Sequence, residues 1–286
     1  SGYLNNLVIF VRFSDQSEFG QATDTYATMF NGFNSNTMQA YFKEVSYDAL
    51  NIVSFFYPPS QNTMVVSWQD SHPRNYYCPY NLILNPIGYH ENERVEREYD
   101  LLERTIIGVC SAIPPSLVID QNNDGEVDNV CFIIQGAHES GQNQILKPHR
   151  YGFNDRDVRI NGVRVGVYNV QISEHLLLTG TGTLCHEMFH SLGAPDLYRY
   201  DQEIEEMFGP MGKWDLMSYP TNPPQHMCAY MKSKYGNWIA PPDTISVHKH
   251  YMLNPLISPT GNAYAIKSPN SETEYFVVEY RNKSGL

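Results

Sequence analysis

The chain has 286 residues, of which 42% are hydrophobic and 13% aromatic, and it carries a formal net charge of −12. This is the composition of a folded protein, without the charged or low-complexity runs that indicate disorder. The acidic balance argues against nucleic acid or an anionic membrane as a partner. No stretch approaches the roughly 18–20 apolar residues of a membrane helix, so we expect no membrane insertion.

The first half of the sequence alternates predicted strands with predicted helices. Residues 4–13, 51–57 and 130–135 are rich in β-branched and aromatic side chains and are expected to form buried strands. Residues 37–45 and 95–112 are expected to be helical, the second because apolar residues recur there at helical spacing. This mixture points to α/β or α+β layering, and we expect an α+β fold with a mixed sheet.

The second half changes character near residue 200. Residues 163–173 are predicted to be a strand that leads into a helix starting at about Thr183. Beyond it we expect a polar loop (199–214), a short helix (225–236) and short β segments (244–280). We therefore predict one domain made of an N-terminal subdomain, 1–198, and a smaller loop-rich subdomain, 199–286.

The five cysteines are widely spaced, odd in number and include no CxxC pair. They predict neither a disulfide framework nor a thiolate metal site. We expect most of them to be small buried side chains.

Residues 186–196 contain the strongest chemical signal, the pattern HExxHxxGxxD. His186 and His190 lie about 40° apart on one face of a helix, so both imidazoles can bind one zinc ion. Glu187 lies beside them and can accept a proton from a metal-activated water. Gly193 is expected to end the helix and turn the chain back, so that Asp196 can act as the third ligand.

Other carboxylates near this motif keep the third ligand open. They follow Asp196 within the next two dozen residues: Glu203, Glu205, Glu206 and Asp215.

A second motif, Trp-Asp-Leu-Met-Ser-Tyr at 214–219, resembles the methionine turn beneath the metal of metzincins. Met217 is expected to be buried under the site. Tyr219 is expected to stabilise the oxyanion of the tetrahedral intermediate. The alternative is that both residues belong to an ordinary buried turn.

Residues 120–128 space oxygen-bearing side chains as calcium loops do, with a glycine at the sixth position. The twelfth position is Cys131 and not glutamate, so the loop is not an EF-hand. An ion-free Asx-rich turn is the alternative. The expected calcium ligands, including a main-chain carbonyl at position 126, are Asp120, Asn122, Asp124, Glu126 and Asp128.

Together these residues resemble the immune inhibitor A family of secreted bacterial zinc peptidases. The similarity also covers the segment 39–50, Lys-Tyr-Gly-Asn-Trp at 234–238 and Tyr-Phe-Val-Val-Glu-Tyr-Arg at 275–281, in the family's order. It implies a zincin-like (metzincin-like) catalytic domain that hydrolyses peptide bonds and is secreted as a precursor, with signal and prosegment outside this sequence. It also implies that the domain continues beyond Leu286.

We therefore expect a secreted zinc endopeptidase with one catalytic zinc, a structural calcium ion and a protein or peptide substrate. The substrate is expected to lie extended along an edge strand at 165–173. The alternatives are a secreted binding protein descended from a peptidase and a metal-dependent amidase of the cell wall. The sequence leaves the oligomeric state open.

Overall fold

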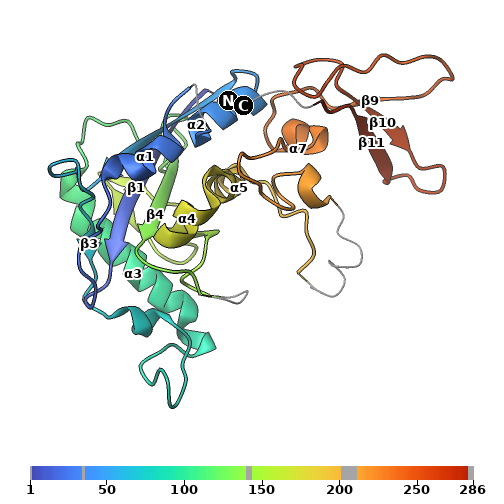
Figure 1. Ribbon diagram of the computed structural model, residues 1–286. Coiled ribbons are helices and arrows are strands. Elements are labelled where there is room, and N and C mark those ends of the chain that lie inside the picture. Colours follow the sequence, from blue (N-terminus) through green and yellow to red (C-terminus); the bar gives the residue numbers. More distant parts are fainter. Residues whose placement is uncertain (1, 34–35, 140–143, 201–210, 283–286) are drawn as a thin grey trace.

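The computed structural model describes residues 2–33, 36–139, 144–200 and 211–282. A mixed β-sheet forms its centre (Figure 1). The strand order is β2-β1-β4-β8-β5, and β3 pairs with β1 beyond the end of β2. Every pair in the sheet is parallel except β5–β8. The strands are β1 (Gly2–Arg12), β2 (Leu50–Tyr57), β3 (Trp68–Gln69), β4 (Asn129–Ile134), β5 (His149–Gly152) and β8 (Val167–Ile172).

Helices cover both faces of this sheet. Along β1, Leu7, Ile9 and Val11 point into one core, and Val8 and Phe10 point into the other, because strand side chains alternate. The first core contains α3 (Arg94–Val109). The second contains residues of α1 (Thr23–Phe30), α2 (Met38–Val45), α4 (Ser173–Thr179) and α5 (Thr181–Ser191). The two apolar layers explain why the strands contain few polar residues.

The C-terminal part adds a small separate sheet. It has the order β11-β10-β9 and lies past α7 (Ala229–Lys234), at the red end of the chain in Figure 1. Its strands are β9 (Asp243–Thr244), β10 (Ala263–Lys267) and β11 (Tyr275–Glu279). The remaining short elements are the hairpin β6 (Arg159–Ile160) and β7 (Val163–Arg164) and the 3-10 turns Arg74–Tyr77, Glu91–Glu93, Cys110–Ala112 and Gly212–Trp214.

Most predicted elements are confirmed, but the predicted strand at 163–173 is two strands. Val163 and Arg164 belong to the β6–β7 hairpin, and β8 begins only at Val167. The prediction that this segment is a sheet edge is wrong. Residues 167–170 pair with β5 on one side, and β8 pairs with β4 on the other, so β5 is the edge strand.

The five cysteines are free thiols. Cys131, Cys185 and Cys228 are buried, as expected, and Cys78 and Cys110 are half-buried. No helix in the described ranges has both the length and the apolar character needed to cross a bilayer.

Candidate metal centre

Helix α5 carries the HExxH motif through the centre of the fold. It ends as predicted: Gly193 has a positive φ of 93°, and its backbone N–H donates to the His190 carbonyl at 2.9 Å. The Ala194 N–H donates to the Phe189 carbonyl at 3.2 Å, which completes a glycine-based helix end. The chain therefore turns back at the point where Asp196 can approach the two histidines.

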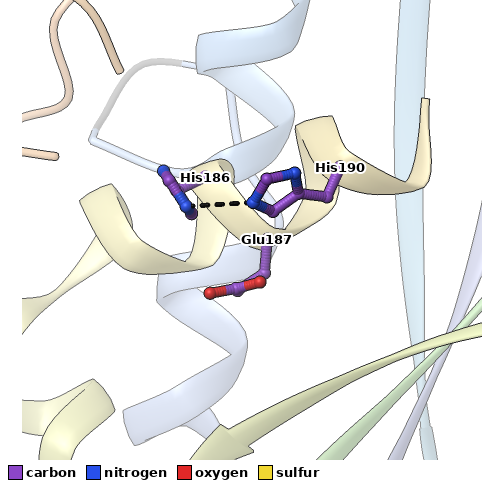
Figure 2. A group of neighbouring side chains, drawn as sticks. All are labelled: His186, Glu187 and His190. Atoms are coloured by element: carbon purple, nitrogen blue, oxygen red, sulfur yellow. Dashed lines mark hydrogen bonds between the residues drawn. The ribbon is translucent and has the colours of Figure 1, made fainter. Parts of the chain in front are cut away.

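Backbone carbonyls fix both imidazole rings. His186 Nδ1 lies 3.0 Å from the Leu216 carbonyl oxygen, and His190 Nδ1 lies 2.7 Å from that of Ala194. A carbonyl can only accept a hydrogen bond, so each Nδ1 carries a hydrogen and donates it. In the neutral rings each Nε2 therefore presents a lone pair. Figure 2 shows the two Nε2 atoms facing each other, and they are 3.1 Å apart.

Asp196 adds a third acceptor at the same point. Its Oδ1 lies 3.2 Å from both Nε2 atoms and is buried without a hydrogen-bond donor. Its Oδ2 accepts the Tyr200 hydroxyl at 2.6 Å. Two ligands of a tetrahedral zinc ion, each about 2.0–2.1 Å from it, are about 3.3 Å apart. The separations of the three acceptors are close to this value, so these residues fit a zinc ion.

The charges of the group lead to the same conclusion. Burial alone would lower the pKa of His186, but Asp196, Glu187 and the Leu216 carbonyl raise it to about 9. Burial would raise the pKa of Asp196, but the imidazoles of His186 and His190, which attract its carboxylate when protonated, and the Tyr200 hydroxyl hold it far below its ordinary value. The cluster therefore requires a positive charge at its centre, supplied either by protons or by a metal cation.

Glu187 lies beside this group. Its carboxylate comes within 4.8 Å of ligand atoms of both histidines, and the residue is buried. In Figure 2 its side chain leaves the helix next to the two rings. Glu187 is therefore placed to exchange a proton with a molecule bound at the cluster.

The turn that contains Met217 contacts the candidate site through its backbone. Met217 is fully buried in the core, and its neighbour Leu216 provides the carbonyl that orients His186. The Tyr219 side chain is 56% exposed, and its ring lies 5.2 Å from Lys213 Nζ. Among the described residues, the Tyr219 side chain has no hydrogen bond to the two histidines or to Asp196, so its oxyanion role stays a prediction.

The structure argues against Asp215 as the third ligand. Its carboxylate is fully buried and accepts the backbone N–H groups of Met217 at 2.7 Å and Cys228 at 2.6 Å. Asp215 therefore braces the turn. The three glutamates that the sequence also left open as the third ligand, Glu203, Glu205 and Glu206, lie outside the described residues.

A buried row of polar side chains crosses the sheet beneath α5, and none of the sequence motifs predicted it. Asn129 donates to Asn6 at 2.7 Å and to Asn169 at 2.9 Å, and Asn6 donates to Ser54 at 3.0 Å. These residues come from β1, β2, β4 and β8. Asparagines within otherwise apolar strands were the available signal, since buried amides need partners.

This row reaches helix α5 directly. The Asn169 amide donates to the Glu187 carbonyl at 2.9 Å and to the Ser191 hydroxyl at 3.1 Å. Ser191 in turn donates to Asn129 at 2.8 Å. The asparagines therefore fix the backbone of α5 at the residue that follows His186.

Two tyrosines near Asp196 were not predicted either. The Tyr200 hydroxyl binds the Asp196 carboxylate, and the Tyr198 ring stacks at 6.4 Å on His186. Burial, followed by the charge of Asp196, raises the Tyr198 pKa well above its ordinary value, so its hydroxyl stays protonated. Their positions two and four residues after Asp196 gave no periodic signal that identified them.

Hydrogen bonds within the loop at 120–128 involve three of the predicted calcium ligands. Asp120 accepts the N–H groups of Asp124 at 3.1 Å and Gly125 at 2.9 Å. Asn122 donates to Asp124 at 2.7 Å. Within the loop the Asp120 carboxylate therefore binds backbone groups, while the side chains of Asn122 and Asp124 contact each other.

At the other two predicted positions, 128 and 126, the side chains have other partners, although the ligand predicted at 126 is the main-chain carbonyl. Asp128 accepts the N–H groups of Asn5 at 2.9 Å and Gln121 at 3.0 Å, so it ties the loop to β1. The Glu126 carboxylate pairs with Arg164. Burial is the main cause of the raised pKa of Asp128. Calcium binding by this loop stays a prediction.

No protein-family model matches the sequence, and a comparison with curated proteins gives no match. Among solved structures, two crystal forms of wild-type OgpA from Akkermansia muciniphila are similar, with TM-scores of 0.39 and 0.36 and identities of 14% and 13%. Both alignments cover 80% of this chain and 58% of OgpA, so the chain spans little more than half of that protein. These values are too low to assign a fold or an activity.

Proposed function

We propose that the chain is a zinc-dependent endopeptidase with a zincin-like catalytic domain, in which His186, His190 and Asp196 hold the metal. One observation supports this above all others. Two imidazole nitrogens and one carboxylate oxygen, none of them supplied with a donor by the neutral protein, meet within 3.2 Å. Such a set of acceptors is stable only around a cation.

Zinc held there would polarise a substrate carbonyl and lower the pKa of a water molecule to about 7. Glu187 acts as the general base: its carboxylate takes a proton from the attacking water and then passes it to the leaving amine. The carbonyls of Leu216 and Ala194 keep both rings aimed at the cluster while this proton moves. Tyr219 is proposed as the oxyanion donor.

The substrate platform is revised from β8 to β5. This strand is the antiparallel edge of the sheet and contacts α5. Among the described residues β5 pairs only with β8, so an extended peptide can pair with its other side and pass alongside the helix. We propose this strand, His149–Gly152, as the surface along which the substrate lies.

The resemblance to the immune inhibitor A family extends the proposal to the whole protein. It suggests a secreted bacterial enzyme, made as a precursor, with calcium in the loop at 120–128. Extracellular calcium is millimolar, which suits a weak loop site of this kind.

The test compares the parent with Glu187→Gln, using Glu174→Gln, an exposed glutamate on α4, as the matched control. Glu187→Gln should cut cleavage of denatured casein at least about 100-fold. Both variants should keep about one zinc per chain, since the ligands are untouched. Equal cleavage by the Glu187 variant would refute the role of this residue, and a parent that binds no zinc would refute the site.

The same preparation distinguishes an endopeptidase from an amidase and from a binding protein. Bacterial cell walls are digested in parallel with casein, with and without a chelator. Release of cross-link peptides without cleavage of casein would favour an amidase. Zinc binding with neither activity would favour a binding protein.

A further inference from the structure

A loop between the 3-10 turns Arg74–Tyr77 and Glu91–Glu93 exposes three consecutive aliphatic side chains. Leu82, Ile83 and Leu84 are 75%, 85% and 82% exposed, and we call them the apolar tip. The loop projects from the body at the N-terminal end of α3, at the bottom of Figure 1. Three neighbouring aliphatic residues this exposed are unusual on a protein surface and indicate a contact site.

The loop holds the apolar tip in a fixed conformation. Asn81 and Asn85 exchange backbone hydrogen bonds of 3.0 and 2.9 Å. The Asn81 side-chain oxygen accepts the N–H groups of Ile83 at 3.0 Å and Leu84 at 2.9 Å. The Asn85 amide donates to the Pro79 carbonyl at 2.9 Å. The tip is therefore already ordered before it binds, so binding costs it little conformational entropy.

These hydrogen bonds also suit an apolar environment. In hydrocarbon every backbone donor needs a partner within the protein. The N–H groups of Ile83 and Leu84 already have one in Asn81, so the tip can leave water without breaking them.

The surroundings of the tip carry no unbalanced charge. Residues 79–89 contain no Asp, Glu, Lys or Arg. At the base of the loop Arg94 pairs with Glu91 at 3.3 Å, and Arg97 pairs with Glu93 at 3.1 Å. Below the tip the rings of Tyr80 and His90 lie 4.3 Å apart. Aromatic rings with polar atoms are favoured at the membrane–water interface.

We propose that the apolar tip inserts shallowly into the headgroup–acyl boundary of a zwitterionic lipid bilayer. The tip presents hydrocarbon and no polar side chain, so it lacks the polar groups that give a protein interface its specificity. The net charge of −12 disfavours anionic lipid. The sequence led us to expect no membrane insertion. The loop is far too short to span a bilayer, and shallow contact of its tip revises that expectation.

The first test is sedimentation of the full chain with phosphatidylcholine vesicles. Leu82→Ser/Ile83→Ser/Leu84→Ser should weaken partitioning at least about tenfold. The control Leu178→Ser/Met252→Ser, which removes exposed apolar side chains elsewhere, should partition like the parent. Replacing a third of the lipid by phosphatidylserine should weaken binding of the parent.

The second test locates the contact. Tryptophan is placed in Ile83→Trp and, as a control, in Leu178→Trp, and the parent spectrum is subtracted. Brominated phosphatidylcholine should quench only the tryptophan at position 83. Equal quenching at both positions, or no sedimentation of the parent, would overturn the proposal. If the parent binds only to membranes that contain proteins, its partner is a protein and not the lipid. That result would also overturn the proposal.

Discussion

The metal-free chain should become less stable as the pH rises from about 6.5 to 9. Burial disfavours the imidazolium of His186, but Asp196 and Glu187 more than compensate and raise its pKa to about 9. The folded chain therefore binds this proton more tightly than the unfolded chain. The stabilisation is complete below the unfolded pKa of 6.5 and disappears as the pH rises through about 9.

The magnitude follows from the two pKa values. The interval from 6.5 to about 9, at about 1.4 kcal/mol per pH unit, corresponds to at most about 3–4 kcal/mol of unfolding free energy. His186 is only 5% exposed, so water screens the interaction little. The lowered pKa of Asp196 arises from the same contact with His186, so it adds no further free energy to this value.

The assay is urea unfolding in chelator at pH 6.5 and pH 9, for the parent and for Asp196→Asn. Another buried group acts in the opposite direction: burial, followed by Arg281, lowers the pKa of Lys232 to about 7, so this lysine favours folding as the pH rises above 7. Both proteins keep Lys232, so the difference between their unfolding free energies reports on the candidate metal centre alone. This difference in unfolding free energy should be largest at pH 6.5 and smaller at pH 9.

Zinc should reverse this loss of stability with rising pH. Ligating imidazoles must lose their protons, so stabilisation by zinc should grow as the pH rises towards about 9, the pKa of His186 in the metal-free chain. A constant difference in unfolding free energy between the parent and Asp196→Asn from pH 6.5 to 9 would refute the claim that Asp196 stabilises a protonated His186. Zinc stabilisation that is stronger at pH 5 than at pH 7 would refute imidazole ligation.

Three further predictions concern the surroundings of the site. Gly193→Ala should lower the unfolding free energy, measured by chemical denaturation, by about 1–2 kcal/mol, because φ at this position is 93°. The new Cβ would meet nothing within 4 Å, so the cost comes from the backbone conformation. The control Gly20→Ala, also in open space but without a positive φ, should change the unfolding free energy little. Asn169→Leu should cost about 1–3 kcal/mol in the same assay, because the Asn129 amide and the Glu187 carbonyl lose a partner. Millimolar calcium should raise the Tm of the parent and not of Asp124→Asn, and an unchanged parent would mean that the loop binds no calcium.

The sequence was most informative where the relevant contacts are local. Two histidines four residues apart face one way on any helix, and the glycine after them ends that helix whatever surrounds it. The position of Asp196 follows from these two facts. For the same reason β1 and α3 were predicted within a few residues of their observed bounds.

Non-local pairing limited the rest. The four residues of β5 show no alternation of polar and apolar side chains, and only their pairing with β8 makes them a strand. Residues 163–172 have a β-type composition throughout, although Val163 and Arg164 belong to the β6–β7 hairpin and β8 begins at Val167. Composition alone therefore could not show where one strand ends and the next begins. Helix α4 was missed because Gly180 separates it from α5 by a single residue.

The asparagine row beneath α5 has a consequence for engineering. Apolar packing tolerates small rotations of a helix about its own axis, since contact area changes little, whereas hydrogen bonds are directional and set that angle. A metal centre needs its ligands within about 0.5 Å of their working positions. Replacing the entire row with well-packed aliphatic residues could therefore preserve the melting temperature while misaligning the imidazoles. At these positions a screen for thermostability alone would select chains in which the proposed metal ligands are no longer aligned.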